Sequence, residues 1–148
     1  MGLPPQEERK RRAEYIENLD ETMLLGGVEL SEFSNRIISD CDVAYIAGAD
    51  LAVLFLAVAA IESHFRFEGY IGANESLAAS ISSAPIEEDV KDEIHRLRTL
   101  RNRWVHVKKP RDDGDLQINP RPINRELSEM AGLAIHTLRR VIYDNQWV

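Results

Sequence analysis

A basic segment in the second half of the chain contains the residue types that cleavage of an RNA phosphodiester uses. Residues 94–111 include seven Lys or Arg and no Asp or Glu, and Arg101, Asn102 and His106 lie within them. A histidine can take the proton of a 2′-hydroxyl or protonate a leaving oxygen. An arginine can bind the scissile phosphate through parallel hydrogen bonds and offset the charge that develops there. The pattern predicts a ribonuclease site in which Arg101 and His106 are catalytic and Asn102 supports them.

The helix that should position these groups has the clearest amphipathic pattern in the sequence. Apolar residues recur at spacings of three and four over residues 85–107, and Pro85 opens the run ahead of acidic residues that suit a helix N-terminus. Trp104 belongs to the apolar stripe, so we expect it in the core rather than as a platform for stacking bases. The pattern predicts one helix that ends near His106.

The polar side of this helix brings most of the chemical groups together. At about 100° per residue, His95, Asn102 and His106 fall within about 40° of one another, and Arg98 flanks them. Arg101 lies at the border of the apolar stripe, where its stem can pack while its guanidinium reaches the same cleft. The side chains predicted to contact RNA are His95, Arg98, Arg103, Lys108 and Lys109.

Simpler interpretations of the same residues remain open. His106 can be a helix-terminal histidine that interacts with the helix dipole, and the basic run can be a solvated helix face. Glu62, on the preceding helix, either forms a structural ion pair with Arg101 or helps to position the catalytic groups without contacting the RNA.

Helical periodicity dominates the rest of the chain and predicts a single all-α domain over residues 1–148. The N-terminal helix within residues 1–30 is expected at its periphery, and residues 107–122 are expected to form a loop. An Ala/Ser-rich piece at 75–83 is either a short helix or an irregular connector. The five helices are expected at 5–25, 31–39, 42–67, 85–107 and 124–143.

The expected central helix, residues 42–67, is apolar nearly all round. Such a helix is either buried beneath several others or uses a second apolar face for self-association. Asp40 or Asp42 is available as its N-cap. Asp50 falls inside its main apolar stripe, so an Arg from another helix is expected beside that carboxylate.

Composition excludes several classes of protein. A net charge of −7 argues against chain-wide attraction to nucleic acid or to an anionic membrane, so any contact with RNA must be local. Cys41 is the one cysteine and cannot form an intramolecular disulfide, and neither HExxH nor CxxC occurs to bind zinc. The start of the chain has no secretory pattern, and Asp50 interrupts the long apolar stretch 43–61. We therefore expect a cytoplasmic protein without metal, cofactor or membrane span.

The segment from Arg101 to His106 resembles the signature of the HEPN (higher eukaryotes and prokaryotes nucleotide-binding) superfamily, in which an Arg is followed by four to six residues and a His. A polar residue directly after the Arg is usual there, and Asn102 fits. The apolar helix that ends in Ala-Ile-Glu-Ser, with Glu62, is also similar. One position departs from the pattern, because Lys108 stands where some toxin members have a Tyr that a partner enzyme modifies.

The resemblance implies a four- to five-helix up-and-down bundle that forms a homodimer in which the two motifs face each other. It implies a metal-independent endoribonuclease that leaves a 2′,3′-cyclic phosphate and acts as a toxin or in antiphage defence, with an antitoxin or regulatory protein as partner. A non-catalytic HEPN-like dimer that binds nucleic acid, a nucleotide or a protein partner is the alternative, and the acidic net charge favours it.

Overall fold

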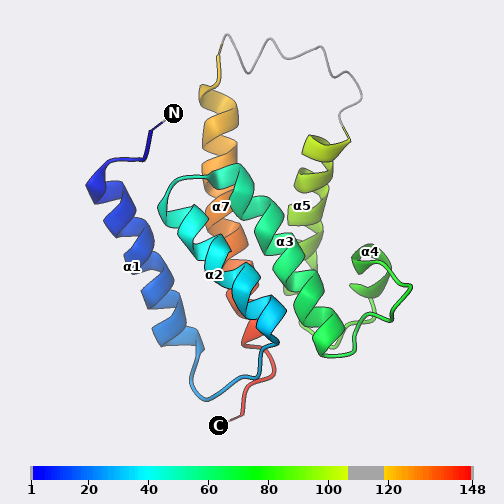
Figure 1. The fold of residues 1–148 in the computed structure, drawn as a ribbon. Coiled ribbons are helices and arrows are strands. Elements are labelled where there is room, and N and C mark those ends of the chain that lie inside the picture. Colours follow the sequence, from blue (N-terminus) through cyan, green and yellow to red (C-terminus); the bar gives the residue numbers. More distant parts are fainter. Residues whose placement is uncertain (1, 107–118, 148) are drawn as a thin grey trace.

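The structure is a computed structural model, which describes residues 2–106 and 119–147, and all of its described helices are α-helices (Figure 1). α3 and α7 pack against each other at the centre of the bundle, with α2 and α1 on one side and α5 on the other. The sequence prediction of an all-α chain is therefore confirmed for these residues. The helices are α1 (Gln6–Met23), α2 (Glu32–Ile46), α3 (Asp50–Phe67), α4 (Leu77–Ser80), α5 (Glu88–Val105) and α7 (Arg121–Ile142).

The core is built around α3 because this helix presents apolar side chains to several neighbours at once. Val53, Ala57 and Ile61 are fully buried, and α2, α7 and α5 all pack on this helix. The prediction that the apolar helix is buried beneath several others is confirmed for this side. Its solvent side is also apolar in part, since Ala52 and Ala59 are exposed.

The main difference from the sequence prediction is a break between α2 and α3. α2 continues to Ile46, and Gly48 then adopts a φ of +77°, a conformation that glycine tolerates better than other residues. Asp40 and Asp42 consequently lie inside α2, so the prediction that one of them caps the central helix was wrong. The expected helix 42–67 is two helices.

Other helix boundaries moved by a few residues. α5 starts at Glu88 and ends at Val105, so His106 becomes its C-cap residue. α7 starts at Arg121, ahead of the expected residue 124, because Pro122 sits in the first turn where a missing N–H costs nothing. The Ala/Ser-rich piece contains the single-turn helix α4.

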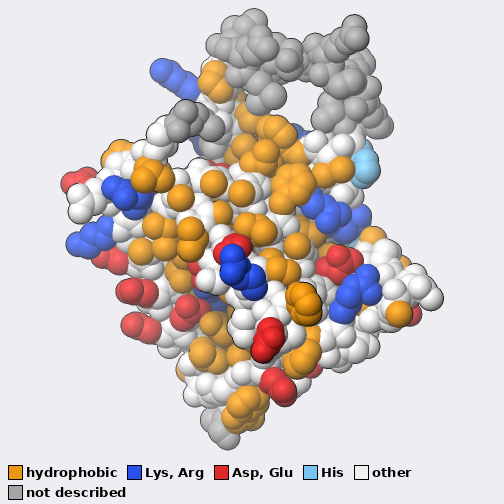
Figure 2. Space-filling view, viewed as in Figure 1, with side chains coloured by type: hydrophobic (Ala, Val, Ile, Leu, Met, Phe, Trp, Pro, Cys, Tyr) orange, Lys and Arg blue, Asp and Glu red, His pale blue; other side chains and the backbone are white. Residues whose placement is uncertain are grey.

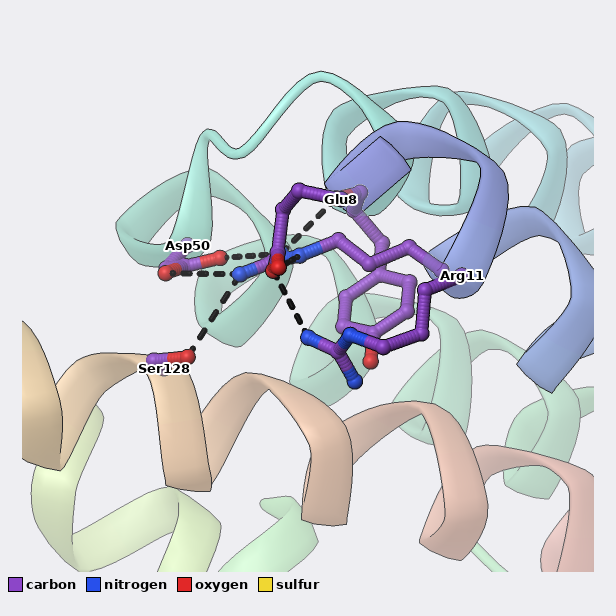
Figure 3. Close-up of polar contacts among 6 residues, drawn as sticks. Glu8, Arg11, Asp50 and Ser128 are labelled. Atoms are coloured by element: carbon purple, nitrogen blue, oxygen red, sulfur yellow. Dashed lines mark hydrogen bonds and ion pairs between the residues drawn. The ribbon is translucent and has the colours of Figure 1, made fainter. Parts of the chain in front are cut away.

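The expected Arg partner of Asp50 is Arg12 of α1, which is 5% exposed. Arg12 Nη1 donates to Asp50 Oδ1 at 2.6 Å and to the Tyr45 carbonyl at 2.8 Å, and its guanidinium lies over the Tyr45 ring. Figure 3 shows Glu8 and Asp50 approaching this guanidinium from α1 and α3, with Ser128 of α7 beneath it. α1 is thus joined to α3 and α7 through a buried charge.

A second buried arginine ties α7 to α1 and α2. Arg139 is 2% exposed and makes two hydrogen bonds to the carboxylate of Asp42, at 2.7 and 2.6 Å. Its Nε donates to Asp20 Oδ1 at 3.1 Å. Because each guanidinium meets carboxylates from different helices, these charges are compensated and also define how the helices align.

Within the described ranges, no helix combines the length and the apolar character that crossing a membrane requires.

Candidate functional site

The three residues predicted to form the catalytic group meet at the C-terminal end of α5. Arg101 donates to the side-chain oxygen Oδ1 of Asn102, from Nε at 3.3 Å and from Nη2 at 2.9 Å. The backbone N–H of His106 donates to the main-chain carbonyl of Asn102 at 2.8 Å. The side chains of Arg101 and Asn102 therefore contact each other, whereas the bond to His106 is the backbone bond that an α-helix makes between residues four apart.

The exposure of these groups is compatible with contact to a large ligand. Arg101 and Asn102 are half-buried, and His106 is exposed at the helix C-cap with non-helical backbone angles. The helix terminates here because His106 leaves the α conformation after one last helical hydrogen bond. Arg101 thus lies on the packed part of α5, whereas the imidazole of His106 is exposed to solvent at the end of this helix.

Two arginines near this end of α5 form no ion pair with a carboxylate of the described residues. Among the described residues, no carboxylate lies within ion-pair distance of Arg98 or Arg101, and the buried Nε of Arg98 has no hydrogen-bond partner. In contrast, Arg12, Arg139 and Arg140 each contact two or more carboxylates. Figure 2 shows basic side chains over the C-terminal half of α5, next to a histidine. An anion approaching this end meets cations whose charge is not already neutralised by described groups.

Two of the predicted RNA contacts lie on the side of α5 that faces α7. His95 and Arg103 line a groove between α5 and α7. Arg103 Nη1 forms an ion pair with Glu126 Oε1 at 3.1 Å, so its charge is partly offset. Lys108 and Lys109, also predicted to contact RNA, lie outside the described residues.

Glu62 does not have the partner that the sequence suggested. Its Oε1 lies 3.5 Å from Nη2 of Arg66, one turn further along α3. Of the two interpretations that the sequence left open, the ion pair with Arg101 is not formed, and the supporting role stays a prediction. Arg66 also donates to the carbonyls of Gly72 and Glu75. Glu62 therefore belongs to a set of contacts that hold the loop after α3.

Trp104 is half-buried against the core, as its place on the apolar stripe predicted. It also lines a cavity of about 510 Å³ together with the α2–α3 turn at Gly48 and with Ile123 and Leu127 of α7. Sequence reasoning missed this cavity, because it depends on the break at Gly48, which the apolar pattern concealed.

Two other reactive side chains are buried away from α5. Burial raises the pKa of the Cys41 thiol to about 12, which leaves it protonated at neutral pH and unsuited to act as a nucleophile. Burial lowers the pKa of His64, although Glu68 nearby acts in the opposite direction. Within the described part of the chain, no three His, Cys, Asp or Glu side chains come together as metal ligands would.

Comparison with known proteins found no match for this chain among family models, curated proteins or solved structures.

Proposed function

We propose that the chain is a metal-independent endoribonuclease of the HEPN type, and that it acts as a cytoplasmic toxin or in antiphage defence. The observation that carries the proposal is the pair of hydrogen bonds from the Arg101 guanidinium to the Asn102 side chain, about one turn before the exposed His106 that caps α5. Arg101 also has no described carboxylate as an ion-pair partner.

The reaction is an in-line attack of the 2′-oxygen on the adjacent phosphorus. This step forms a 2′,3′-cyclic phosphate and breaks the bond to the 5′-oxygen, which leaves as a hydroxyl. The imidazole of His106 exchanges protons in this step, either by taking the 2′-hydroxyl proton or by supplying one to the leaving oxygen. The guanidinium of Arg101 stabilises the negative charge on the non-bridging oxygens. Asn102 holds Arg101 in place and keeps its NH₂ group available to the substrate.

A homodimer would provide both proton-transfer groups, because each copy contributes one His106. The solvent side of α3 suits this contact, since Ala52 and Ala59 are exposed and Phe55 and Leu56 are only half-buried. Figure 2 shows apolar side chains spread over the face that carries α2 and α3. Val105, next to His106 at the end of α5, is 52% exposed and adds an apolar side chain beside the motif. An apolar surface of this kind favours association.

The proposal is tested with purified protein and end-labelled RNA in EDTA. We expect cleavage that leaves 2′,3′-cyclic phosphate ends, and we expect His106→Ala and Arg101→Ala each to lower the rate at least about a hundredfold. His136→Ala and Arg36→Ala serve as matched controls on α7 and α2 and should retain the rate. Absence of cleavage by the folded wild-type protein, or full activity of His106→Ala, would overturn the proposal.

The role of the dimer is tested in parallel by Ala59→Arg, which introduces a charge into the α3 surface. We expect a monomer in sedimentation and loss of cleavage, with the circular dichroism spectrum unchanged. A monomeric wild-type protein that still cleaves RNA would remove the dimer from the mechanism.

A non-catalytic HEPN-like dimer is the second candidate, and the net charge of −7 favours it because proteins that bind RNA over a wide surface are usually basic. Such a module would bind nucleic acid, a nucleotide or a protein partner such as an antitoxin. RNA binding by the wild-type protein without any product, under conditions where it is dimeric, would favour this candidate over the nuclease.

A further inference from the structure

A second hollow lies between α5 and α7, and neither Arg101 nor Asn102 lines it. It is an open groove of about 350 Å³, within the size range of small-ligand sites. Arg101 and Arg103 are two positions apart, and a step of two residues turns a helix by about 200°. The groove that Arg103 lines and the Arg101 guanidinium therefore lie on opposite flanks of α5. The side chains that carry the argument are His95, Arg96, Thr99 and Arg103 of α5 and Glu126 and Met130 of α7.

The α5 wall of the groove offers donors suited to a phosphate. Arg96 is exposed, and its one hydrogen-bond contact within the described chain is a weak one to Met130 Sδ at 4.0 Å. His95 is half-buried and Thr99 adds a hydroxyl. A guanidinium, an imidazole and a hydroxyl on one wall can together satisfy several oxygens of a phosphate monoester.

The α7 wall of the groove has a different character. Met130 is half-buried and presents a flexible, polarisable thioether beside the buried Leu100. Glu126 accepts a hydrogen bond from Arg103 and lies at the same groove. A thioether beside a carboxylate acceptor can contact an aromatic base that carries an exocyclic amino group.

We propose that this groove binds one nucleotide unit, with its phosphate at Arg96 and His95 and its base against Met130. The same chemistry is presented by a free nucleoside monophosphate and by one residue of an RNA strand. The RNA form of the inference rests on the proposed function, because there the groove would hold a nucleotide neighbouring the cleaved bond. The free-nucleotide form does not depend on it.

The first experiment measures binding of AMP, adenosine and inorganic phosphate by calorimetry. We expect AMP to bind more tightly than either fragment, and Arg96→Gln to weaken AMP binding about tenfold, as loss of a charged hydrogen bond does. The matched control is Lys10→Gln, which removes one positive charge from the exposed face of α1 and should leave the affinity unchanged. Equal affinity of wild-type protein and Arg96→Gln for AMP would overturn the inference, as would an absence of binding both to AMP and to a short RNA.

A second variant is expected to strengthen binding of a phosphate to the groove, whereas Arg96→Gln is expected to weaken binding. Glu126→Gln removes the carboxylate that pairs with Arg103 and so leaves the groove more positive. We expect inorganic phosphate to bind about threefold or more tightly to this variant, since a negative charge beside the site is lost and Arg103 is released. A purely structural role for Glu126 would instead weaken binding or leave it unchanged, and that result would contradict the proposed site.

The RNA arm separates this inference from the proposed function. With a short RNA substrate, Arg96→Gln should raise KM and leave kcat unchanged, whereas His106→Ala should abolish kcat and leave AMP binding unchanged. AMP binding by a protein that never cleaves RNA would support the groove and overturn the nuclease. Cleavage with a KM unaffected by Arg96→Gln would support the nuclease and remove RNA as the occupant of the groove.

Discussion

At the scale of single residues, the bundle depends on buried arginines such as Arg12 and Arg139, each of which pairs with a carboxylate from another helix. Arg139 is the clearest case, because its side chain is 2% exposed and Asp42 binds both of its terminal nitrogens. Removing one partner of such a pair leaves a charge in a site where water cannot solvate it. The contribution of each carboxylate to the free energy of unfolding should therefore depend on how deeply it is buried and on the geometry of its ion pair, more than on its position in the sequence.

We expect Asp42→Asn to lower the free energy of unfolding by about 3 kcal/mol, because Arg139 remains buried with only Asp20 to compensate it. Asp40→Asn is a matched control on the same helix, since Asp40 pairs with Arg36 on the surface. That change should cost less than about 1 kcal/mol. Urea unfolding of both variants measures the difference, and equal losses would contradict the assigned role of Asp42.

His64 gives the protein a sensitivity to acid. Its side chain is 3% exposed, its Nδ1 has no hydrogen-bond partner and burial lowers its pKa. In the unfolded chain the imidazole takes a proton as the pH falls below about 6.5, while the folded chain resists protonation. Stability contributed by the neutral imidazole is therefore present above this pH and is lost as the pH falls below it.

We expect His64→Gln to reduce the loss of unfolding free energy between about pH 7 and pH 5, because the group whose pKa differs between the two states is gone. His95→Gln retains His64 and should keep the acid sensitivity of the wild-type protein. Denaturation midpoints recorded across this pH range test the prediction. An unchanged pH profile for His64→Gln would show that other groups cause the sensitivity.

At the scale of elements, the turn between α2 and α3 lies beside the C-terminal end of α5, because both line one cavity. Gly48 has a φ of +77°, and a Cβ at this position would lie 3.1 Å from Pro4 Cγ. The turn forms one wall of the cavity that Trp104 also lines. A change in the backbone conformation at Gly48 would thus alter how Trp104 packs near the end of α5.

Gly48→Ala should lower the free energy of unfolding by about 1–2 kcal/mol, because alanine is disfavoured at positive φ. Gly132→Ala is the matched control, since Gly132 lies inside α7 and a Cβ there has only ordinary contact with the Tyr45 hydroxyl at 3.9 Å. The free energy of unfolding of Gly132→Ala should be higher than that of the wild-type protein by about 0.5–1 kcal/mol. Thermal unfolding of the two variants should show shifts of opposite sign, and a stabilised Gly48→Ala would contradict the strained turn.

At the scale of the whole molecule, the C-terminal segment closes the bundle against the loop after α1. Gly27 and Trp147 exchange backbone hydrogen bonds at 2.8 and 2.9 Å. Gln146 Oε1 accepts from the backbone N–H of Leu25 and of Gly26, both at 2.8 Å. Segments about 120 residues apart in sequence are therefore held side by side.

We expect Gln146→Ala to cost about 1 kcal/mol and to speed hydrogen exchange at the amides of Leu25 and Gly26, because both lose their acceptor. Asn145→Ala should have little effect on these amides, since its side chain makes one 3.4 Å contact, to Glu68. Exchange rates measured by NMR distinguish the two variants. Equal protection in wild-type protein and Gln146→Ala would show that the backbone pair with Trp147 is sufficient.

The amphipathic spacing of the sequence determined the helical class, the course of α5, the core position of Trp104 and the need of Asp50 for an arginine. These features follow from local periodicity and from the cost of burying a lone charge, both of which can be evaluated without knowing the fold. The placement of Asn102 and His106 on one side of α5 was also predictable, because residues four apart on a helix are neighbours. The hydrogen bonds between Arg101 and Asn102 were not, because residues one apart do not face each other.

Only the tertiary structure decided which partner each charge meets. The identity of Arg12 as the partner of Asp50, the pairing of Asp42 with Arg139 and the position of His95 and Arg103 on the α7 groove depend on contacts between distant segments. The break at Gly48 was hidden for a related reason: apolar residues continue on both sides of it, and periodicity alone does not distinguish one long buried helix from two packed against each other.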